Sequence, residues 1–218
     1  MNKRCVIISG GTIEDSFALQ ILNDVKPQTV IGVDGGLSFL YRNDIMPTHI
    51  VGDFDSADKE VVAYYRNQRG IDIREFNPVK DATDTEIAVR LALELGVKEI
   101  VLLGATGTRL DHVMANIQIL KIALEQGVQA YIQDGTNRIS LWEKEIRLSK
   151  ENGFGTYFSL FPLGGVVEGL FIQGAKYPLS NYTMNPYESR TVSNEYEAED
   201  VLITFSSGIV VLMETRDK

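Results

Sequence analysis

The sequence predicts an α/β fold in two domains: an N-terminal domain built on a parallel sheet, and a C-terminal domain that is antiparallel and all-β. Up to about residue 132, short β-branched runs alternate with amphipathic stretches, which is typical of βαβ units. After Asp134-Gly135-Thr136-Asn137 the chain changes to short apolar runs broken by Gly, Pro, Asn and Ser. With 218 residues, 44% of them hydrophobic, the chain can bury a full core.

Each expected element of the first domain has a pattern of its own. Apolar residues spaced three or four apart predict two helices, one through Ile87, Leu91 and Leu95 and one through Val113, Ile117, Leu120 and Leu124. The expected strands are Cys5–Ser9, Thr29–Val33, His49–Gly52, Ile71–Phe76, Glu99–Leu103 and Gln129–Ile132.

The second domain shows strand patterns only. Its plainest expected strands are Tyr157–Phe161, Gly165–Ile172, Val201–Phe205 and Ile209–Met213. The pair Ser207-Gly208 between the last two is typical of a tight hairpin turn. We expect the boundary near residues 133–140, which gives domains 1–135 and 136–218.

Composition excludes several classes of function. A net charge of −9 argues against nucleic-acid or anionic-membrane partners, which require basic patches. No apolar stretch approaches the ~20 residues of a spanning helix, and the N-terminal residues lead into a strand pattern rather than a signal peptide, so we expect a cytoplasmic protein. Cys5 is the only cysteine and opens an apolar run, which favours a buried structural role, and a chain with one cysteine and two histidines offers few ligands for zinc.

Two carboxylates separated by one residue follow the expected strand His49–Gly52. In an extended chain, side chains two apart point to the same side, so Asp53 and Asp55 could hold one hard cation, with Mg²⁺ the natural candidate. The alternative is that Asp53 ends the strand while Asp55 and Ser56 cap the next helix. These residues alone favour neither interpretation.

Four other polar segments follow expected strands, and the carboxyl ends of parallel strands meet at one edge of a sheet. Ser9-Gly10-Gly11-Thr12 and Asp34-Gly35-Gly36 could expose amides to a phosphate or could be plain turns. Lys80-Asp81-Ala82-Thr83-Asp84-Thr85-Glu86 brings a cation and two carboxylates to a helix start, although Thr83 and Glu86 have the spacing of a capping box. In Gly107-Thr108-Arg109-Leu110-Asp111-His112, Arg109 suits phosphate oxygens and Asp111 a nitrogen-rich ligand, unless both are ordinary surface residues.

Acids, glycines and a few cations dominate these segments, and no nucleophile–base pair is evident. This set of residue types suits metal-assisted phosphoryl or pyrophosphoryl transfer. In such reactions most of the catalysis comes from positioning the substrates and neutralising the charge of the transferred group.

The same segments give the chain a resemblance to the thiamine pyrophosphokinase family over nearly its whole length. The matching sequence motifs are Asp34-Gly35-Gly36, Pro47 with Gly52-Asp53-Phe54-Asp55-Ser56, Lys80-Asp81-x-Thr83-Asp84-x-Glu86, Gly107-x-Arg109-x-Asp111-His112, Gly174-x-Lys176-Tyr177-x-Leu179 and Ser193-Asn194-Glu195. Two positions depart from the family pattern: Thr108 stands where a second glycine is usual, and Ala175 replaces a larger apolar residue.

The resemblance implies a Rossmann-like domain that binds ATP and Mg²⁺, a C-terminal β-sandwich that binds thiamine, and a homodimer whose active sites lie between subunits. It implies transfer of the β,γ-pyrophosphoryl group of ATP to the hydroxyethyl oxygen of thiamine, which leaves AMP. By matched position, the catalytic metal ligands are Asp53, Asp55 and Asp84; the ATP-site residues are Asp34, Gly35, Gly36, Lys80, Asp81, Thr83 and Arg109; and the thiamine-site residues are Asp111, Tyr177, Ser193 and Asn194.

Two rival functions are open to test. A phosphatase of the haloacid dehalogenase type also places Asp-x-Asp after a strand, with the first Asp as nucleophile. In that family the motif ends the first strand of the core, whereas two strand–helix units precede Asp53 here. A non-enzymatic nucleotide sensor is the other rival, although a sensor needs no acidic metal cluster.

Overall fold

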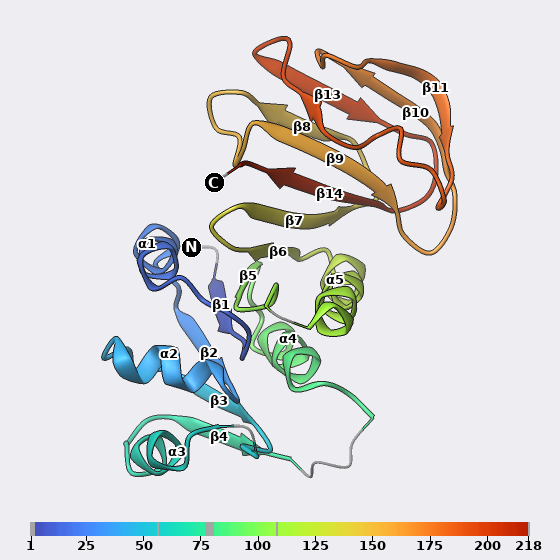
Figure 1. Cartoon of the computed structure of the whole chain (residues 1–218). Coiled ribbons are helices and arrows are strands. Elements are labelled where there is room, and N and C mark those ends of the chain that lie inside the picture. Colours follow the sequence, from blue (N-terminus) through green and yellow to red (C-terminus); the bar gives the residue numbers. More distant parts are fainter. Residues whose placement is uncertain (1–2, 56, 77–80, 108, 218) are drawn as a thin grey trace. The chain divides into compact units, whose positions relative to one another are not determined.

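The computed structural model describes residues 3–55, 57–76, 81–107 and 109–217. The chain divides into two compact units, Met1–Gly135 and Thr136–Lys218, here called the α/β unit and the β unit (Figure 1). No helix within the described ranges is long and apolar enough to cross a lipid bilayer.

The α/β unit is built on a parallel sheet, as the alternation of strand and helix patterns predicts. Its strands pair in the order β6-β5-β1-β2-β3-β4, and every pair is parallel. Because β2 lies on one side of β1 and β5 on the other, the strand order reverses there, and the carboxyl ends of these strands flank a crevice. The strands are β1 (Arg4–Ile8), β2 (Thr29–Val33), β3 (His49–Gly52), β4 (Asp72–Glu75), β5 (Glu99–Leu103) and β6 (Gln129–Gln133).

Helices cover both faces of this sheet. Figure 1 shows α1 (Asp15–Val25), α2 (Gly36–Arg42) and α3 (Lys59–Arg66) on one face and α4 (Asp84–Glu94) and α5 (Leu110–Glu125) on the other. Strand residues are therefore buried on both sides, which explains the continuous apolar runs. Cys5 is fully buried in β1, and burial raises the pKa of its thiol, as expected for a structural cysteine.

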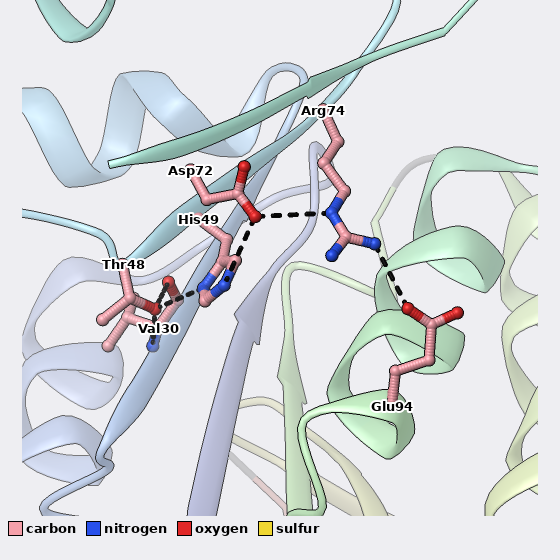
Figure 2. A network of polar contacts seen from close by, with 6 residues as sticks. All are labelled: Val30, Thr48, His49, Asp72, Arg74 and Glu94. Atoms are coloured by element: carbon pink, nitrogen blue, oxygen red, sulfur yellow. Dashed lines mark hydrogen bonds and ion pairs between the residues drawn. The ribbon is translucent and has the colours of Figure 1, made fainter. Parts of the chain in front are cut away.

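A polar network ties strands β2, β3 and β4 to α4 at the edge where β3 and β4 begin (Figure 2). The Thr48 hydroxyl donates to the Val30 carbonyl at 2.9 Å, and His49 Nδ1 lies 2.8 Å from the same hydroxyl. Asp72 lies between His49 and Arg74, and Arg74 reaches Glu94 of α4 at 3.2 Å. This edge is opposite the carboxyl ends of the strands, so the network has a structural role.

The β unit consists of two antiparallel sheets that share one core, in agreement with the predicted all-β domain. The sheets have the orders β12-β9-β14-β7 and β11-β10-β13-β8. Phe158 and Leu212 from the first sheet and Ile172 and Ile203 from the second belong to one hydrophobic cluster. The strands are β7 (Asn137–Trp142), β8 (Ile146–Ser149), β9 (Tyr157–Pro162), β10 (Val167–Gln173), β11 (Leu179–Met184), β12 (Asn194–Glu195), β13 (Asp200–Thr204) and β14 (Val210–Thr215).

The predicted hairpin at Ser207-Gly208 is wrong. Strand β13 pairs with β8 and β10, whereas β14 pairs with β7 and β9, so the segment between them carries the chain from one sheet to the other. The amide of Ser206 donates to the carbonyl of Glu168, and the amide of Glu168 donates to the carbonyl of Ser207, which fixes the crossing. Both strands bury side chains in the same core from opposite sides, a pattern that resembles a hairpin when only the sequence is considered.

Candidate active site

A cavity of about 440 Å³ lies at the carboxyl ends of the strands of the α/β unit. It brings together the segments after β1, β2 and β5 with the starts of α4 and α5, which are far apart in the sequence. The expectation that these polar segments converge is therefore confirmed. The predicted residues that line it include Gly10, Asp34, Gly35, Thr83, Asp84 and Arg109.

Two helices begin at this cavity. Thr83 is the N-cap of α4, and its hydroxyl accepts a hydrogen bond from the amide of Glu86 at 3.2 Å, so the capping interpretation of Thr83 is confirmed. Arg109 occupies the N-cap position of α5. Helix N-termini carry a partial positive charge and unpaired amides, so the cavity suits an anion such as a phosphate group.

The Asp34 side chain links the loop after β2 to the loop after β3. Its Oδ1 accepts a hydrogen bond from the amide of Phe54 at 3.2 Å. A side chain at Gly52 would place its Cβ 1.9 Å from this oxygen, so only glycine allows Asp34 to lie across the end of β3. The motif aspartate thus positions the segment that carries Asp53 and Asp55.

Carboxyl groups crowd around Asp34. Burial raises the pKa of Asp34 to about 7, and the negative charge of Asp84, which is within hydrogen-bonding reach, and that of Asp53 act in the same direction. The structure therefore brings Asp34, Asp53 and Asp84 into electrostatic contact. A cation placed among them would relieve this repulsion.

Asp53 and Asp55 are not helix caps. Helix α3 begins at Lys59, and Asp58 caps it by accepting a hydrogen bond from the amide of Glu60 at 2.8 Å. Asp53 Oδ1 instead accepts a hydrogen bond from the amide of Asp55 at 3.0 Å, and the Asp55 side chain is exposed. The capping alternative is therefore wrong for Asp55, while Ser56 lies outside the described residues.

The described carboxylates do not form a complete metal site by themselves. Within residues 3–55, 57–76, 81–107 and 109–217, no three His, Cys, Asp or Glu side chains are arranged to hold a metal ion. Mg²⁺ in phosphate-transferring sites typically takes one or two carboxylates and completes its coordination with phosphate oxygens and water. Crowded carboxylates next to a cavity that suits an anion fit that mode of binding.

Arg109 and Asp111 bind each other at the start of α5. Arg109 Nε donates to Asp111 Oδ1 at 3.1 Å, and a second guanidinium nitrogen donates to Oδ2, which makes the pair bidentate. The Arg109 guanidinium lowers the pKa of Asp111 to about 2. Both side chains are exposed, so the pair contributes little stability and can open to a ligand.

The predicted residues Asp53, Asp55, Asp81 and Asp111 are not among the residues that line the cavity. Asp81 is exposed ahead of α4, and Gly36 is buried against the backbone of β1 instead of lining the cavity. Lys80 and Thr108 lie outside the described residues.

Sequence reasoning missed two polar residues in the cavity wall. Asn116 is buried and donates to the carbonyl of Ala105 at 2.9 Å, which fixes the loop after β5. The Thr85 hydroxyl lies 3.1 Å from that of Ser9, which joins the end of β1 to α4. Asn116 is a polar residue four positions after His112 and lies on the otherwise apolar face of α5. That break in the apolar pattern could have identified it from the sequence.

The crowding around Asp34 predicts a pH-dependent gain in stability for Asp34→Asn in the absence of divalent cations. The unfolded carboxyl titrates near 3.8 and the folded one near 7, so the wild-type protein loses unfolding free energy as the pH rises through this window. The variant avoids this loss and keeps an acceptor for the Phe54 amide. Allowing for solvent screening, we expect it to be more stable by about 1–2 kcal/mol at pH 8 and by much less at pH 4. Urea denaturation at both values measures the difference, and an equal effect at both would contradict the assignment.

In the β unit, Asn194 holds Tyr177 in place. The side chain of Asn194 is buried, and its Oδ1 accepts a hydrogen bond from the backbone N–H of Tyr177 at 3.0 Å. Its Nδ2 donates to the backbone carbonyl of Tyr177 at 2.9 Å. The Tyr177 side chain is 54% exposed and therefore available to a ligand. The Lys176 ammonium lies 5.6 Å from the Tyr177 ring and pairs with Glu195 at 2.6 Å.

Ser193, also predicted for the thiamine site, is exposed and has a left-handed backbone with φ 55°. Its backbone amide donates to the Ser159 hydroxyl.

Comparisons with known proteins match both units. Residues 23–132 match the family model described as thiamin pyrophosphokinase, catalytic domain, and residues 143–210 match thiamin pyrophosphokinase, vitamin B1 binding domain. The chain belongs to the thiamine pyrophosphokinase family. Members of this family are diphosphotransferase enzymes.

Individual members of the thiamine pyrophosphokinase family are similar over most of the chain. The thiamine pyrophosphokinase of Bacillus subtilis is 29% identical over 193 residues, which cover 86% of this chain and 87% of the relative. Its crystal structure has a TM-score of 0.87 at 27% identity and covers 99% of this chain and 100% of that chain. The structure of the Geobacillus thermodenitrificans protein has a TM-score of 0.82 at 28% identity, with 99% and 98% covered.

The two family matches divide the predicted site residues. The catalytic-domain match contains Asp34, Asp53, Asp84 and Arg109, whereas the vitamin B1 binding match contains Tyr177, Ser193 and Asn194. Asp111, the other residue predicted for the thiamine site, lies within the catalytic-domain match, so the predicted thiamine-site residues are divided between the two matches.

Proposed function

We propose that this chain transfers the β,γ-pyrophosphoryl group of ATP to the hydroxyethyl oxygen of thiamine, forming thiamine diphosphate and AMP by direct displacement. The observation that carries the proposal is the cavity of the α/β unit, where two helix N-termini meet a crowded group of carboxyl side chains. Positive helix ends bind phosphates, and carboxylates bind the cation that accompanies them. The strand order, with its reversal beside β1, fits a Rossmann-like nucleotide-binding domain.

The phosphates of ATP are held by the backbone around Gly10 and Gly35, by the start of α4 at Thr83, and by Arg109. Lys80 and Asp81 precede α4 and would add contacts from its N-terminal side. An Arg109 side chain that turns towards phosphate leaves Asp111, which then accepts hydrogen bonds from the aminopyrimidine of thiamine. One movement would thus prepare both substrate sites.

Asp53, Asp55 and Asp84 would hold Mg²⁺ together with phosphate oxygens, while Asp34 positions their loops. When bound, this ion supplies charge neutralisation on the transferring group. The carboxylates would hold the ion beside the phosphates, and the backbone amides of the cavity would help to orient the transferring group.

Tyr177 offers an aromatic face to the permanently cationic thiazolium ring, an attraction of up to about 2 kcal/mol when water is excluded. Asn194 fixes the backbone that presents this ring, and Ser193 lies beside it in sequence, suited to the aminopyrimidine. Tyr177 belongs to the β unit, whereas the proposed metal ligands belong to the α/β unit. We therefore propose a homodimer in which each active site takes its two halves from different subunits.

Nucleotide turnover tests the proposed function. With ATP and Mg²⁺ we expect AMP to form only when thiamine is present, and we expect no ADP. AMP formation without thiamine, or phosphate release alone, would favour the phosphatase rival. Nucleotide binding without turnover under any of these conditions would favour the sensor.

The stereochemistry at phosphorus tests direct displacement. The sequence shows no evident nucleophile–base pair, so we expect the hydroxyl of thiamine to attack the β-phosphorus without a covalent enzyme intermediate. A chiral β-phosphorothioate analogue of ATP should then give thiamine diphosphate with inverted configuration. Retention of configuration, or a trapped phosphoryl group on Asp53, would instead indicate two successive displacements.

A further inference from the structure

A second cavity, of about 540 Å³, lies wholly among residues of the β unit. Its wall is formed by the loop between β8 and β9, the end of β12 with the residue that follows it, and the residue after β14. The residues that the argument uses are Lys150, Gly153, Phe154, Glu195, Tyr196 and Arg216. The functions proposed above for Tyr177 and Ser193 do not use any of them.

The wall is positively charged in a chain whose net charge is −9. Lys150 and Arg216 contribute two cations, and both side chains are exposed. The carboxylate of Glu195 is offset by Lys176, whose ammonium lies 2.6 Å away. A local excess of positive charge on an acidic protein favours an anionic ligand.

Phe154 gives this cavity a fixed aromatic surface. The guanidinium of Arg216 lies 4.7 Å from the centroid of its ring, and that of Arg138 lies 5.1 Å away. The Phe154 amide donates to the buried carboxylate of Glu214 at 3.1 Å, which anchors the loop to β14. The wall is therefore held by specific contacts and keeps Arg216 close to an apolar face.

The hydroxyl of Tyr196 is buried beside this cavity and has no hydrogen-bond partner among the described residues. Its ring packs edge-on against Phe158, and a Cβ on Gly153 would lie only 2.7 Å from its oxygen, so a glycine is needed to admit it. Burial and the charge of Glu214 raise the pKa of Tyr196 to about 12, so the group is a donor at neutral pH. A buried donor without an acceptor costs about 1–3 kcal/mol, which a bound acceptor would recover.

We propose that this cavity binds a phosphate group, carried on a small organic molecule or as the free anion, with Lys150 and Arg216 supplying positive charge and the Tyr196 hydroxyl donating a hydrogen bond. An organic body would lie against Phe154. The volume is in the range of small-molecule sites and leaves room beyond a single phosphate.

Amide shifts of the full-length ¹⁵N-labelled protein test this proposal. Inorganic phosphate and phenyl phosphate are titrated separately at constant ionic strength. We expect saturable shifts at Gly153 and Gly155, which report this cavity, in addition to any at Gly10 and Gly35, which report the cavity of the α/β unit. Tighter binding of phenyl phosphate identifies a phosphate ester as the preferred ligand, and equal binding identifies the free anion.

Two substitutions separate binding from folding. Tyr196→Phe keeps the ring but removes the hydroxyl, and Lys150→Gln removes one charge; each should weaken binding at Gly153 and Gly155 roughly five- to tenfold. Lys144→Gln changes an exposed lysine of the same unit that does not line the cavity, and should bind as the wild type does. The melting temperature of ligand-free Tyr196→Phe should be unchanged or higher, because its hydroxyl has no partner to lose among the described residues.

Three results would overturn the proposal: shifts confined to Gly10 and Gly35, shifts at Gly153 that rise without saturation, or variants that all bind with wild-type affinity.

Discussion

Replacing Asp53, Asp55 or Asp84 by asparagine should reduce turnover at least about 100-fold, because each change removes a charge from the proposed magnesium site. The melting temperature of the metal-free protein should be unchanged for Asp55→Asn and unchanged or higher for the other two. Asp53 and Asp84 both add to the negative charge around Asp34, so removing either charge relieves repulsion in the folded state. Steady-state AMP formation and thermal denaturation without divalent cations measure the two effects.

Asp24→Asn is the matched control, since Asp24 is an exposed acid on α1, away from the carboxyl ends of the strands. It should turn over at the wild-type rate. Near-normal turnover of Asp55→Asn would remove Asp55 from the metal site, and a large loss of stability in Asp84→Asn would show that its carboxylate has a structural role instead.

Mixing two inactive variants should restore activity if each active site takes its halves from different subunits. Asp55→Ala damages the α/β half and Tyr177→Ala the β half, so their heterodimer has one doubly damaged site and one intact site. Random subunit exchange at equal concentrations makes about half the dimers heterodimers, each with half of its sites intact. We therefore expect recovery to roughly a quarter of the wild-type activity.

Subunit exchange must be confirmed by native mass spectrometry, with the wild-type dimer mixed with each variant as the reference for full exchange. If exchange is complete and activity does not recover, both halves of the site belong to one chain and the proposed shared arrangement is refuted.

Periodicity was sufficient to predict the parallel sheet and its two most regular helices. The β-branched runs of β1, β2, β3 and β5 are buried on both faces, so their composition reflects the sheet that they form. In the β unit the same reasoning found strands but mistook the crossing at Ser207-Gly208 for a hairpin. A strand pattern records which side chains are buried, but not which sheet the strand joins.

The convergence of the polar segments could be predicted because the carboxyl ends of parallel strands meet at one edge of a sheet. Spacing could not decide between capping and binding. Thr83 does cap α4, whereas the cap of α3 is Asp58, so Asp55 is not needed for that role.

Contacts between segments that are distant in the chain could not be predicted from the sequence. The hydrogen bond from the Phe54 amide to Asp34 and the buried Asn116 amide both depend on how separate loops meet at the edge of the sheet. No pattern along the chain contains that information. The same holds for the crowding of Asp34 with Asp84, which lie fifty residues apart in sequence and become neighbours only when β2 and α4 pack together.

The central claim is that a pyrophosphoryl group moves intact from ATP to thiamine, and ATP labelled at a single phosphorus tests it most directly. In separate reactions with [β-³²P]ATP and [γ-³²P]ATP, the account predicts that both labels appear in thiamine diphosphate, with one AMP formed for each thiamine diphosphate. Label from the γ position alone in a thiamine product, with ADP as the other product, would contradict the claim, as would label released as inorganic phosphate without thiamine.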